Sequence, residues 1–406
     1  MAVPIYRSAG VGRAVGGDIM VATWSIPDLP FFDESHVELG ARLTEWVEKA
    51  SEPIEKNSPY FTEECREIAG EMAEWVFLDY VVPDGDSPRR QVDVRAVSLI
   101  REALAYRSGL VDSVFVMQGL ATAPLWLTDS TELCRAYLQP CRQGKRIAAF
   151  AVTEPNAGSD VAALETTAKR DGDHFVLNGH KRWISNAGAA DLYIVLARTG
   201  EAPGSRGLSA FLVEADTPGL KVGPEVAMIA PHPIGEVSFT DCRIPATQMV
   251  GAPGEGFKAA MKTFDIFRTS VGAAALGMAR RALAETIEHT QTRQLFGGPL
   301  AQMPTVQATL ADMALDTQTA SLLVYRSAWL KDTRQGRHSD AVAMAKLGAT
   351  EAAHRVADNA VQLFGALGVA RGSIVEKIYR EVRPMRIYEG ASEVQKVIIA
   401  RSLLQS

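Results

Sequence analysis

The chain has 406 residues, and at about 150 residues per domain this length favours two or three domains. Hydrophobic residues make up 47% of it and charged residues 22%, and 42 basic against 48 acidic side chains give a net charge of −6. A mildly acidic chain without a basic tract disfavours a general binder of nucleic acids or anionic membranes. No unbroken apolar run approaches the roughly 20 residues of a membrane-spanning helix. We therefore expect a cytoplasmic, bacterial-type soluble protein with neither nucleic-acid partner nor membrane span.

The start of the chain and its cysteines carry little chemistry. Residues 1–25 hold glycine and polar residues without a periodic apolar pattern, which predicts a flexible extension. Seven scattered histidines lack the spacing of metal ligands, so we expect no metal. The cysteines form no Cys-x-x-Cys pair and are expected to be reduced thiols; they are Cys65, Cys134, Cys141 and Cys242.

The first third of the chain is expected to be helical. Apolar residues recur at helical spacing from about Asp33, beginning with Val37, Leu43 and Trp46. The pattern continues through a loop at 83–88 until a proline and a glycine end it near residue 144. We predict an N-terminal all-α domain over residues 26–146.

The pattern then changes to short β-branched and aromatic runs separated by turn residues. This texture predicts a middle β domain, a barrel or sandwich, over residues 147–250. The expected strands cover 147–152, 174–184, 192–197, 208–213 and 236–239.

A glycine-rich break at 251–256 precedes long amphipathic helices. One begins at Phe257, and others are expected over 304–332, 340–367 and 392–404. Long helices joined by short loops favour an antiparallel four-helix bundle over residues 251–406. The fold class is therefore α+β, in the order helices, β domain, helical bundle.

Two segments of the β domain combine hydroxyls, an indole and a tight turn. A predicted strand ends at Thr153, and the Pro/Gly turn after it exposes backbone N–H groups and Ser159. On the next strand Trp183 and Ser185 share one face, because side chains alternate along a strand. Such a set suits a flat, heteroatom-rich ring. The alternative is a strand with a buried tryptophan and a loop turned by asparagine.

Two further segments lie in the C-terminal region. Arg293 comes at the end of a long helix, where a basic residue also serves as an ordinary C-cap. Glu389 follows Ile387 and Tyr388, and an apolar flank raises the pKa of a carboxyl group, as a general base requires. The alternative is an exposed loop charge ahead of a helix that Ser392 caps. Nucleophile-elbow, P-loop and HExxH motifs do not occur, and His232 between two prolines indicates a rigid loop.

Taken together, the sequence from about Asp33 to Leu404 resembles the acyl-CoA dehydrogenase family. The motifs are Thr-Glu-Pro-x-Ala-Gly-Ser-Asp at 153–160, Asn-Gly…Trp-Ile-Ser at 178–185, Arg-x-x-Phe-Gly at 293–297, Gln-Leu-Phe-Gly at 362–365 and Ile-Tyr-Glu-Gly-x-Ser-Glu at 387–393. Each motif alone has moderate specificity, but five in this order across an α–β–α layout are highly specific.

The resemblance implies an FAD enzyme whose cofactor lies between the β domain and the bundle. It implies that Thr153 and Ser185 hydrogen-bond the isoalloxazine ring, that Trp183 packs beside it, and that the 293–297 and 362–366 segments reach the FAD of a neighbouring subunit. Family members are commonly tetramers, so a homo-oligomer is expected. The full set of implied FAD contacts is Phe150, Val152, Thr153, Ser159, Trp183, Ser185, Arg293, Phe296, Gln362, Gly365, Ala366, Ser392 and Glu393.

The implied reaction removes two hydrogens from the α and β carbons of an acyl-CoA thioester. Glu389 matches the base that takes the α proton, and flavin N5 takes the β hydride. Some family members place the base just before the arginine that Arg268 matches, but that position is Phe267 here, which accepts no proton. The implied acyl-CoA contacts are Ser159, Asp265, Phe267, Arg268 and Gly390.

Several positions depart from the family pattern. Asn156 replaces a usual glycine, Ser185 and Ala391 replace a common threonine, and Pro304 replaces a common glutamine. The loop 230–235 replaces a stretch that contains serine or threonine near the mouth of the acyl-CoA site.

Because Phe267 is bulky where small residues are frequent, we predict a preference for short branched, cyclic or aryl-substituted acyl groups. An electron-transfer flavoprotein is the expected electron acceptor. Two alternatives stay open: an O2-using relative, either an acyl-CoA oxidase or a flavin monooxygenase, and a non-enzymatic assembly factor on the same fold.

Overall fold

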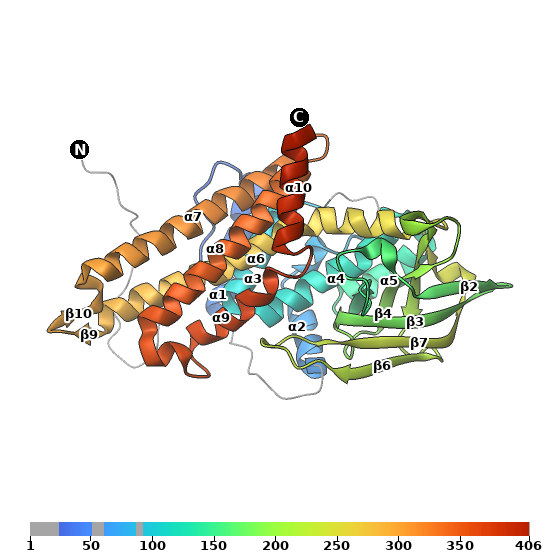
Figure 1. The fold of residues 1–406 in the computed structure, drawn as a ribbon, viewed down its shortest axis with the longest axis horizontal. Coiled ribbons are helices and arrows are strands. Elements are labelled where there is room, and N and C mark those ends of the chain that lie inside the picture. The colour runs from blue at the N-terminus through green and yellow to red at the C-terminus, as the bar shows by residue number, and fades with distance from the viewer. Residues whose placement is uncertain (1–23, 51–60, 87–91, 406) are drawn as a thin grey trace.

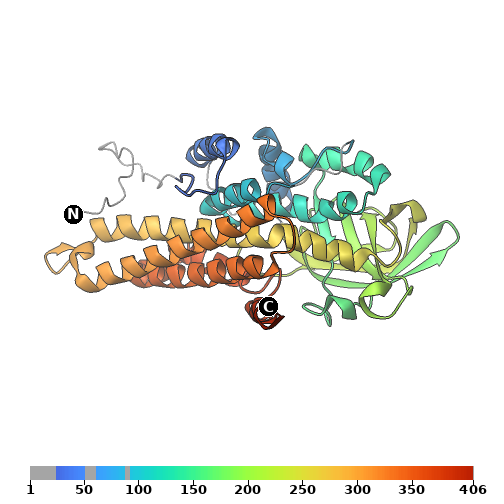
Figure 2. The ribbon, with the colours of Figure 1, turned by 90° about the horizontal axis from the view of Figure 1, so that it is seen from above.

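The computed structural model describes residues 24–50, 61–86 and 92–405. These residues form helices, then a sheet, then a second set of helices, so the predicted α+β class and its order are confirmed (Figure 1). The sheet occupies one end of an elongated molecule, and the long C-terminal helices extend from it toward the other end (Figures 1 and 2).

The described residues of the N-terminal region form five helices and a short 3-10 turn. They are α1 (Glu34–Lys49), α2 (Thr62–Glu74), η2 (Leu78–Tyr80), α3 (Val94–Arg107), α4 (Gly109–Leu127) and α5 (Thr131–Arg142). Asp33 begins α1 with a capping box, in which its side chain accepts from the His36 N–H and the His36 ring accepts from the Asp33 N–H. Every residue of α3 is buried, including Arg101 and Glu102.

Helix α4 is long and apolar enough, by length and composition alone, to cross a membrane. Nearly all of it is buried inside the protein, where it contacts α6 (Gly256–Thr292) and β1 (Ala148–Ala151). Its apolar character is therefore accounted for by packing at the centre of the molecule. The sequence predicts an apolar helix here but no unbroken apolar run of membrane-spanning length, because Asp112, Ser113 and Gln118 interrupt it.

The middle region is one eight-stranded sheet. Its strands run in the order β6-β7-β3-β2-β4-β5-β8, and β1 pairs with β4 in parallel. Three strands, β2, β6 and β8, were not expected from the sequence, since they are short or largely exposed. The strands beyond β1 are β2 (Thr167–Asp171), β3 (His174–Ser185), β4 (Leu192–Arg198), β5 (Leu208–Glu214), β6 (Leu220–Glu225), β7 (Ile234–Pro245) and β8 (Met249–Val250).

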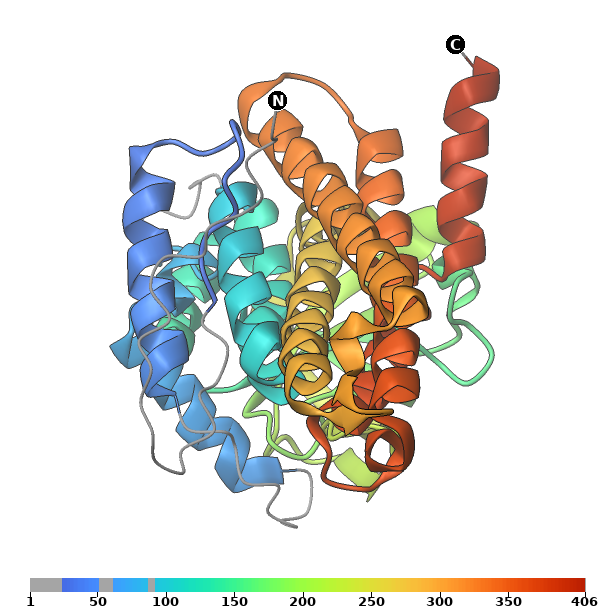
Figure 3. The ribbon, with the colours of Figure 1, turned by 90° about the vertical axis from the view of Figure 1, so that its left-hand side faces the viewer.

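The C-terminal region packs α6, α7 and α8 along their lengths, with α9 beside α8 and α10 across its end (Figure 3). The helix expected to reach residue 367 ends at Phe364, because Gly365 takes a positive φ of 62°. Helix α9 was not expected, and Pro384 inside its last turn obscures it in the sequence. The elements after α6 are β9 (Gln294–Leu295), β10 (Gly298–Pro299), η6 (Leu300–Gln302), α7 (Pro304–Thr333), α8 (Ser339–Phe364), η7 (Gly365–Val369), α9 (Ile374–Met385) and α10 (Ser392–Gln405).

Buried Glu102 joins three regions of the chain. It accepts hydrogen bonds from the Trp24 indole at 3.0 Å, from the Tyr325 hydroxyl and from Arg280. Trp24 is fully buried, so packed structure begins inside the segment predicted as an extension; residues 1–23 of that prediction lie outside the described residues. All four cysteines are free and buried.

Candidate active site

Glu389 lies in the loop between α9 and α10, where the backbone takes an unusual conformation. Glu389 has φ 50° and the following Gly390 has φ 93°. A left-handed glutamate is strained and persists only where its surroundings hold it. Three side-chain donors do so: Arg268 Nε bonds the Glu389 carbonyl at 3.1 Å, and Lys346 Nζ and Gln395 Nε2 bond the Gly390 carbonyl at 2.9 and 2.8 Å. These donors come from α6, α8 and α10, so tertiary packing fixes the loop.

The surroundings of the Glu389 carboxyl group favour its neutral form. Burial raises its pKa above the ordinary value, although Arg101, Arg268 and Lys346 act in the opposite direction. Its Oε2 atom is buried and has no hydrogen-bond partner among the described residues. The predicted alternative, an exposed loop charge, therefore does not describe this residue. A buried carboxylate oxygen without a hydrogen-bond partner is free to accept a proton from a bound ligand.

A buried ion pair lies near this carboxyl group. Arg101 of α3 bonds both oxygens of Asp112 of α4, at 2.8 and 2.7 Å, and reaches Ser270 Oγ of α6 at 3.0 Å. Ser270 in turn donates to the carbonyl oxygen of Phe267 at 2.6 Å. One network thus ties α3 and α4 to the part of α6 that carries Phe267 and Arg268.

The structure brings together the two β segments that the sequence singled out. The Arg182 N–H bonds the Thr153 carbonyl at 2.9 Å, and buried Lys181 bonds the Val152 carbonyl at 3.1 Å. Trp183 sits at an irregularity in the β3–β7 pairing with φ 61°, and 47% of it is exposed. The alternative of a buried tryptophan is therefore wrong.

This surface fits a flavin. Trp183 is exposed, with the Arg182 guanidinium over its ring at 4.9 Å to the centroid, and partly buried Thr153 and Ser185 provide hydroxyls on adjoining segments. Phe150, at the end of β1, packs against Phe264 of α6 with ring centroids 5.9 Å apart, so the β segments and α6 adjoin directly. An aromatic side chain can pack against an isoalloxazine ring, and flanking hydroxyls can donate hydrogen bonds to its heteroatoms.

A second group of predicted residues lies far from Glu389 in the same subunit. The β9–β10 hairpin, with Arg293 just before it, forms the tip of the bundle opposite the sheet (Figures 1 and 2). Phe296 at this tip is 87% exposed. The end of α8 lies nearby, since His289 stacks on Phe364 with centroids 4.1 Å apart. The remaining members here, Gln362, Gly365 and Ala366, are exposed.

The other predicted residues differ in their surroundings. Ser159 is exposed in the turn after β1, and Asp265 lies 3.8 Å from Arg268. Ser392 is buried and donates to Glu351 Oε1 at 2.7 Å, while Glu393 is exposed in the first turn of α10. Phe267 is fully buried.

Sequence reasoning missed several residues of this site. Arg101 and Asp112 sit on helices that are buried on nearly every side, so the absence of a polar face was the signal that could have identified them. Lys346 lies on the buried face of the half-buried α8. His232, expected only to mark a rigid loop, lies 3.0 Å from Ser185 Oγ through its Nε2 atom. Among the described residues, no cluster of His, Cys, Asp or Glu could hold a metal ion.

Comparison with known proteins agrees with this geometry. Residues 149–242 match the acyl-CoA dehydrogenase middle domain, and residues 254–404 match the acyl-CoA dehydrogenase C-terminal domain. The mitochondrial short-chain specific acyl-CoA dehydrogenase of Rattus norvegicus is 35% identical over 100% of this chain and 99% of its own.

Solved structures give the same result. Butyryl-CoA dehydrogenase from Megasphaera elsdenii superposes with a TM-score of 0.84 at 32% identity, over 92% of this chain and 99% of its own. A glutaryl-CoA dehydrogenase from Mycobacterium smegmatis in complex with FADH2 gives a TM-score of 0.82 at 25% identity, over 93% and 96%.

The fold and site thus define a flavin-dependent oxidoreductase. The chain belongs to the acyl-CoA dehydrogenase family, and its cofactor is FAD. The predicted family, enzyme class and cofactor are confirmed.

Proposed function

We propose that this protein oxidises a short acyl-CoA thioester to the trans-2-enoyl-CoA, with Glu389 as the base that takes the α proton. The observation that carries the proposal is the buried, unpartnered Oε2 of Glu389 in a loop held by three donors. Bound FAD supplies the hydride acceptor for the β hydrogen. The chain therefore has to bind the thioester, orient its α carbon toward Glu389 and hold the proton.

The raised pKa of Glu389 supports the assigned role. A more basic carboxylate takes a weakly acidic α proton more readily, and the proton then stays on Oε2 in a site where burial favours the neutral form. The Glu389 backbone N–H and an FAD hydroxyl would donate to the thioester oxygen and favour enolate character. Asp265, Arg268 and Gly390 would contact the CoA thioester near this loop.

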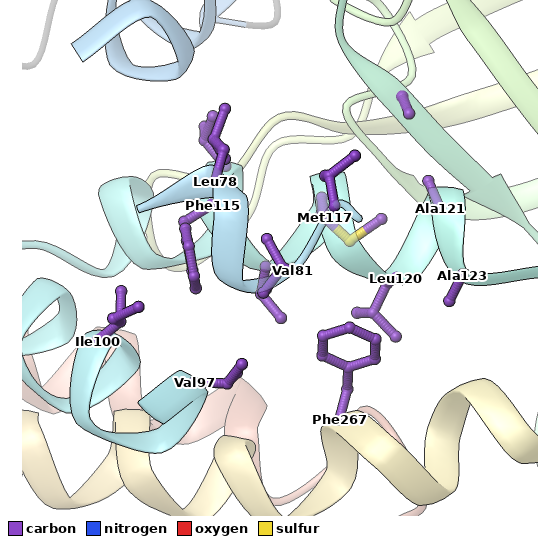
Figure 4. Packing of buried hydrophobic residues seen from close by; sticks show 14 of the residues in the cluster. Leu78, Val81, Val97, Ile100, Phe115, Met117, Leu120, Ala121, Ala123 and Phe267 are labelled. Atoms are coloured by element: carbon purple, nitrogen blue, oxygen red, sulfur yellow. The ribbon is translucent and has the colours of Figure 1, made fainter. Parts of the chain in front are cut away.

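The acyl group is proposed to be short because Phe267 fills the adjoining space. Figure 4 shows the ring rising from α6 toward Leu120 of α4. Two ring carbons lie 2.8 Å from where a side chain on Gly119 would begin, so the ring uses the room that this glycine leaves. The names of the rat and Megasphaera relatives, short-chain and butyryl, agree with this limit. Branched, cyclic and aryl-substituted short acyl groups remain the preferred candidates.

The complete FAD site is proposed to need two subunits. Thr153, Trp183 and Ser185 would hold the ring from one subunit, with Phe150, Val152 and Ser159 contributing from β1 and its turn. The exposed tip with Arg293 and Phe296 would reach the cofactor of a neighbour, and Ser392 and Glu393 would lie over the adenosine side. We infer a homodimer or homotetramer in the cytoplasm, with an electron-transfer flavoprotein as electron acceptor.

Stopped-flow reduction of the bound flavin tests the function. Straight, branched, cyclic and aryl-propionyl CoA thioesters are mixed with the FAD protein, and the reduced flavin is then exposed to air. Rapid reduction by a short thioester with slow reoxidation is the expected result. Rapid reoxidation by O2 would instead indicate an oxidase or monooxygenase, and no reduction by any thioester would indicate an assembly factor.

A further inference from the structure

Ser113, His232 and Ser185 come together from three separate parts of the chain. His232 Nε2 lies 3.0 Å from Ser185 Oγ at the end of β3 and 3.3 Å from Ser113 Oγ near the start of α4. Neither contact is needed to build the sheet or the helix, whose backbones are already bonded. The cluster borders the surface that we assign to the flavin, because Ser185 belongs to both.

The loop that carries His232 is held rigidly. Pro231 and Pro233 flank the histidine and fix the backbone φ on either side. The Pro233 carbonyl accepts from the Asn186 N–H at 2.7 Å, directly beside Ser185. On the other side, Arg380 of α9 bonds the Ile229 carbonyl at 2.9 Å. The imidazole is therefore placed with little freedom to move away from the two hydroxyls.

A single imidazole nitrogen cannot accept fully from both hydroxyls at once. Burial lowers the pKa of His232 to about 4, so the ring is neutral near pH 7. With the ring proton on Nδ1, the Nε2 atom offers one lone pair, for which the hydroxyl hydrogens of Ser113 and Ser185 compete. A serine hydroxyl on a helix also has a second option, the carbonyl four residues earlier.

We propose that Ser113, His232 and Ser185 form a hydrogen-bond relay that responds to the reduction state of FAD and adjusts its reduction potential. This inference rests on the proposed function, in which Ser185 hydrogen-bonds the isoalloxazine ring, and it takes the bonded atom to be the ring nitrogen that accepts the hydride. Oxidised flavin would offer an acceptor at that nitrogen, so Ser185 would donate to it and Ser113 would donate to His232. Reduced flavin would carry a hydrogen there, so Ser185 would accept from it and would turn its own hydrogen to His232.

In this relay His232 and Ser113 have opposite effects on the reduction potential of FAD. His232 stabilises the reduced state, because it accepts the hydrogen that Ser185 must redirect. Ser113 stabilises the oxidised state, because it donates its hydroxyl hydrogen to His232 Nε2 while Ser185 donates to the flavin. Both are positioning residues that act through Ser185, and generic damage to the fold would not produce shifts of opposite sign.

The test is the midpoint potential of bound FAD, measured by dye equilibration in the oligomeric holoenzyme. We expect His232→Leu to lower the equilibrium constant for two-electron reduction about tenfold, which corresponds to about 30 mV. His232→Gln keeps an acceptor at the position of Nε2 and should restore most of this shift. Ser113→Ala should raise the midpoint potential, with an increase of about threefold in the equilibrium constant for two-electron reduction. His174→Leu, at the other end of β3, serves as the matched control and should change nothing.

The outcomes separate the relay from the proposed function. If His232→Leu and Ser113→Ala bind FAD and are reduced by substrate but keep the wild-type midpoint potential, the relay is overturned and the proposed function stands. Shifts of the same sign in both variants would also overturn it. If His232→Leu fails to fold, the upward shift in Ser113→Ala and the near-native potential of His232→Gln still decide the question. A wild-type protein that no thioester reduces would overturn the proposed function first.

Discussion

The loop with Glu389 and the β9–β10 hairpin share an unusual backbone conformation but differ in what holds it. Each carries a non-glycine residue in the left-handed region, Glu389 at φ 50° and Phe296 at φ 51°. Three side chains from other helices hold the first, whereas the second is 87% exposed at the tip of the bundle. Phe296 and Gly297 are the two central residues of a tight turn, which itself requires positive φ at both.

The difference between them indicates what one subunit completes by itself. Contacts inside the subunit hold the strained loop, so the proposed base, Glu389, is positioned before any ligand arrives. The hairpin exposes Phe296 together with the neighbouring Leu295, and we propose that this tip contacts another subunit. We therefore expect changes in the loop to affect chemistry within each subunit, and changes in the hairpin to affect assembly and FAD retention.

The largest expected effect is that of Glu389→Gln. Glutamine is nearly isosteric but takes no proton, so flavin reduction should slow about 10²–10⁴-fold while FAD stays bound. Stopped-flow absorbance at the flavin band measures the rate. Glu132→Gln, an exposed carboxylate on α5, is the control and should react like wild type. A rate within tenfold of wild type would exclude Glu389 as the base.

Phe267→Ala should alter both stability and acyl preference. Removing a fully buried phenylalanine costs about 3–5 kcal/mol of unfolding free energy. The new space should also raise the ratio of kcat/KM for octanoyl-CoA to that for butyryl-CoA about tenfold above the wild-type ratio. The measurements are denaturant unfolding and kcat/KM for both thioesters. Phe115→Ala on α4 loses comparable core volume and should leave the preference unchanged; an identical profile in both variants would show that Phe267 does not limit chain length.

Lys346→Met should move the pH dependence of flavin reduction. The positive charge of Lys346 lowers the pKa of Glu389, so its removal raises that pKa further. Because Glu389 is proposed to work in its ionised form, the acidic limb of the rate profile should shift to higher pH, with slower reduction on the acidic side. Lys258→Met, exposed on α6, is the control. An unshifted limb would mean that Lys346 only supports the loop.

The smallest expected effect on the subunit is that of Phe296→Ser. An exposed ring contributes little to folding, so the melting temperature of the FAD-free protein should change by less than about 1 °C. Sedimentation velocity should nevertheless show a smaller assembly, and FAD should dissociate more readily. Val37→Ser, exposed on α1, should change neither property. Full assembly with tight FAD in Phe296→Ser would refute a role for the hairpin across subunits.

The sequence alone determined the order of elements and singled out Glu389 as the proposed base. Helical spacing, strand texture and glycine breaks are local signals, so the long helices and most strands could be predicted within a few residues. The choice of Glu389 depended on residue types at two positions, a carboxylate at 389 and a phenylalanine at 267. Elements that local patterning marks weakly, such as β2, β6 and α9, were missed.

Only the tertiary structure decided what surrounds those residues. Arg268, which donates to the Glu389 carbonyl, lies 121 positions earlier in the chain. Lys346, which donates to the Gly390 carbonyl, lies 44 positions earlier. The Arg101–Asp112 pair and the contact between His232 and Ser185 likewise join separate elements. Burial shifts the pKa of a group only once distant segments have excluded water from it, and no local pattern in the sequence encodes that event.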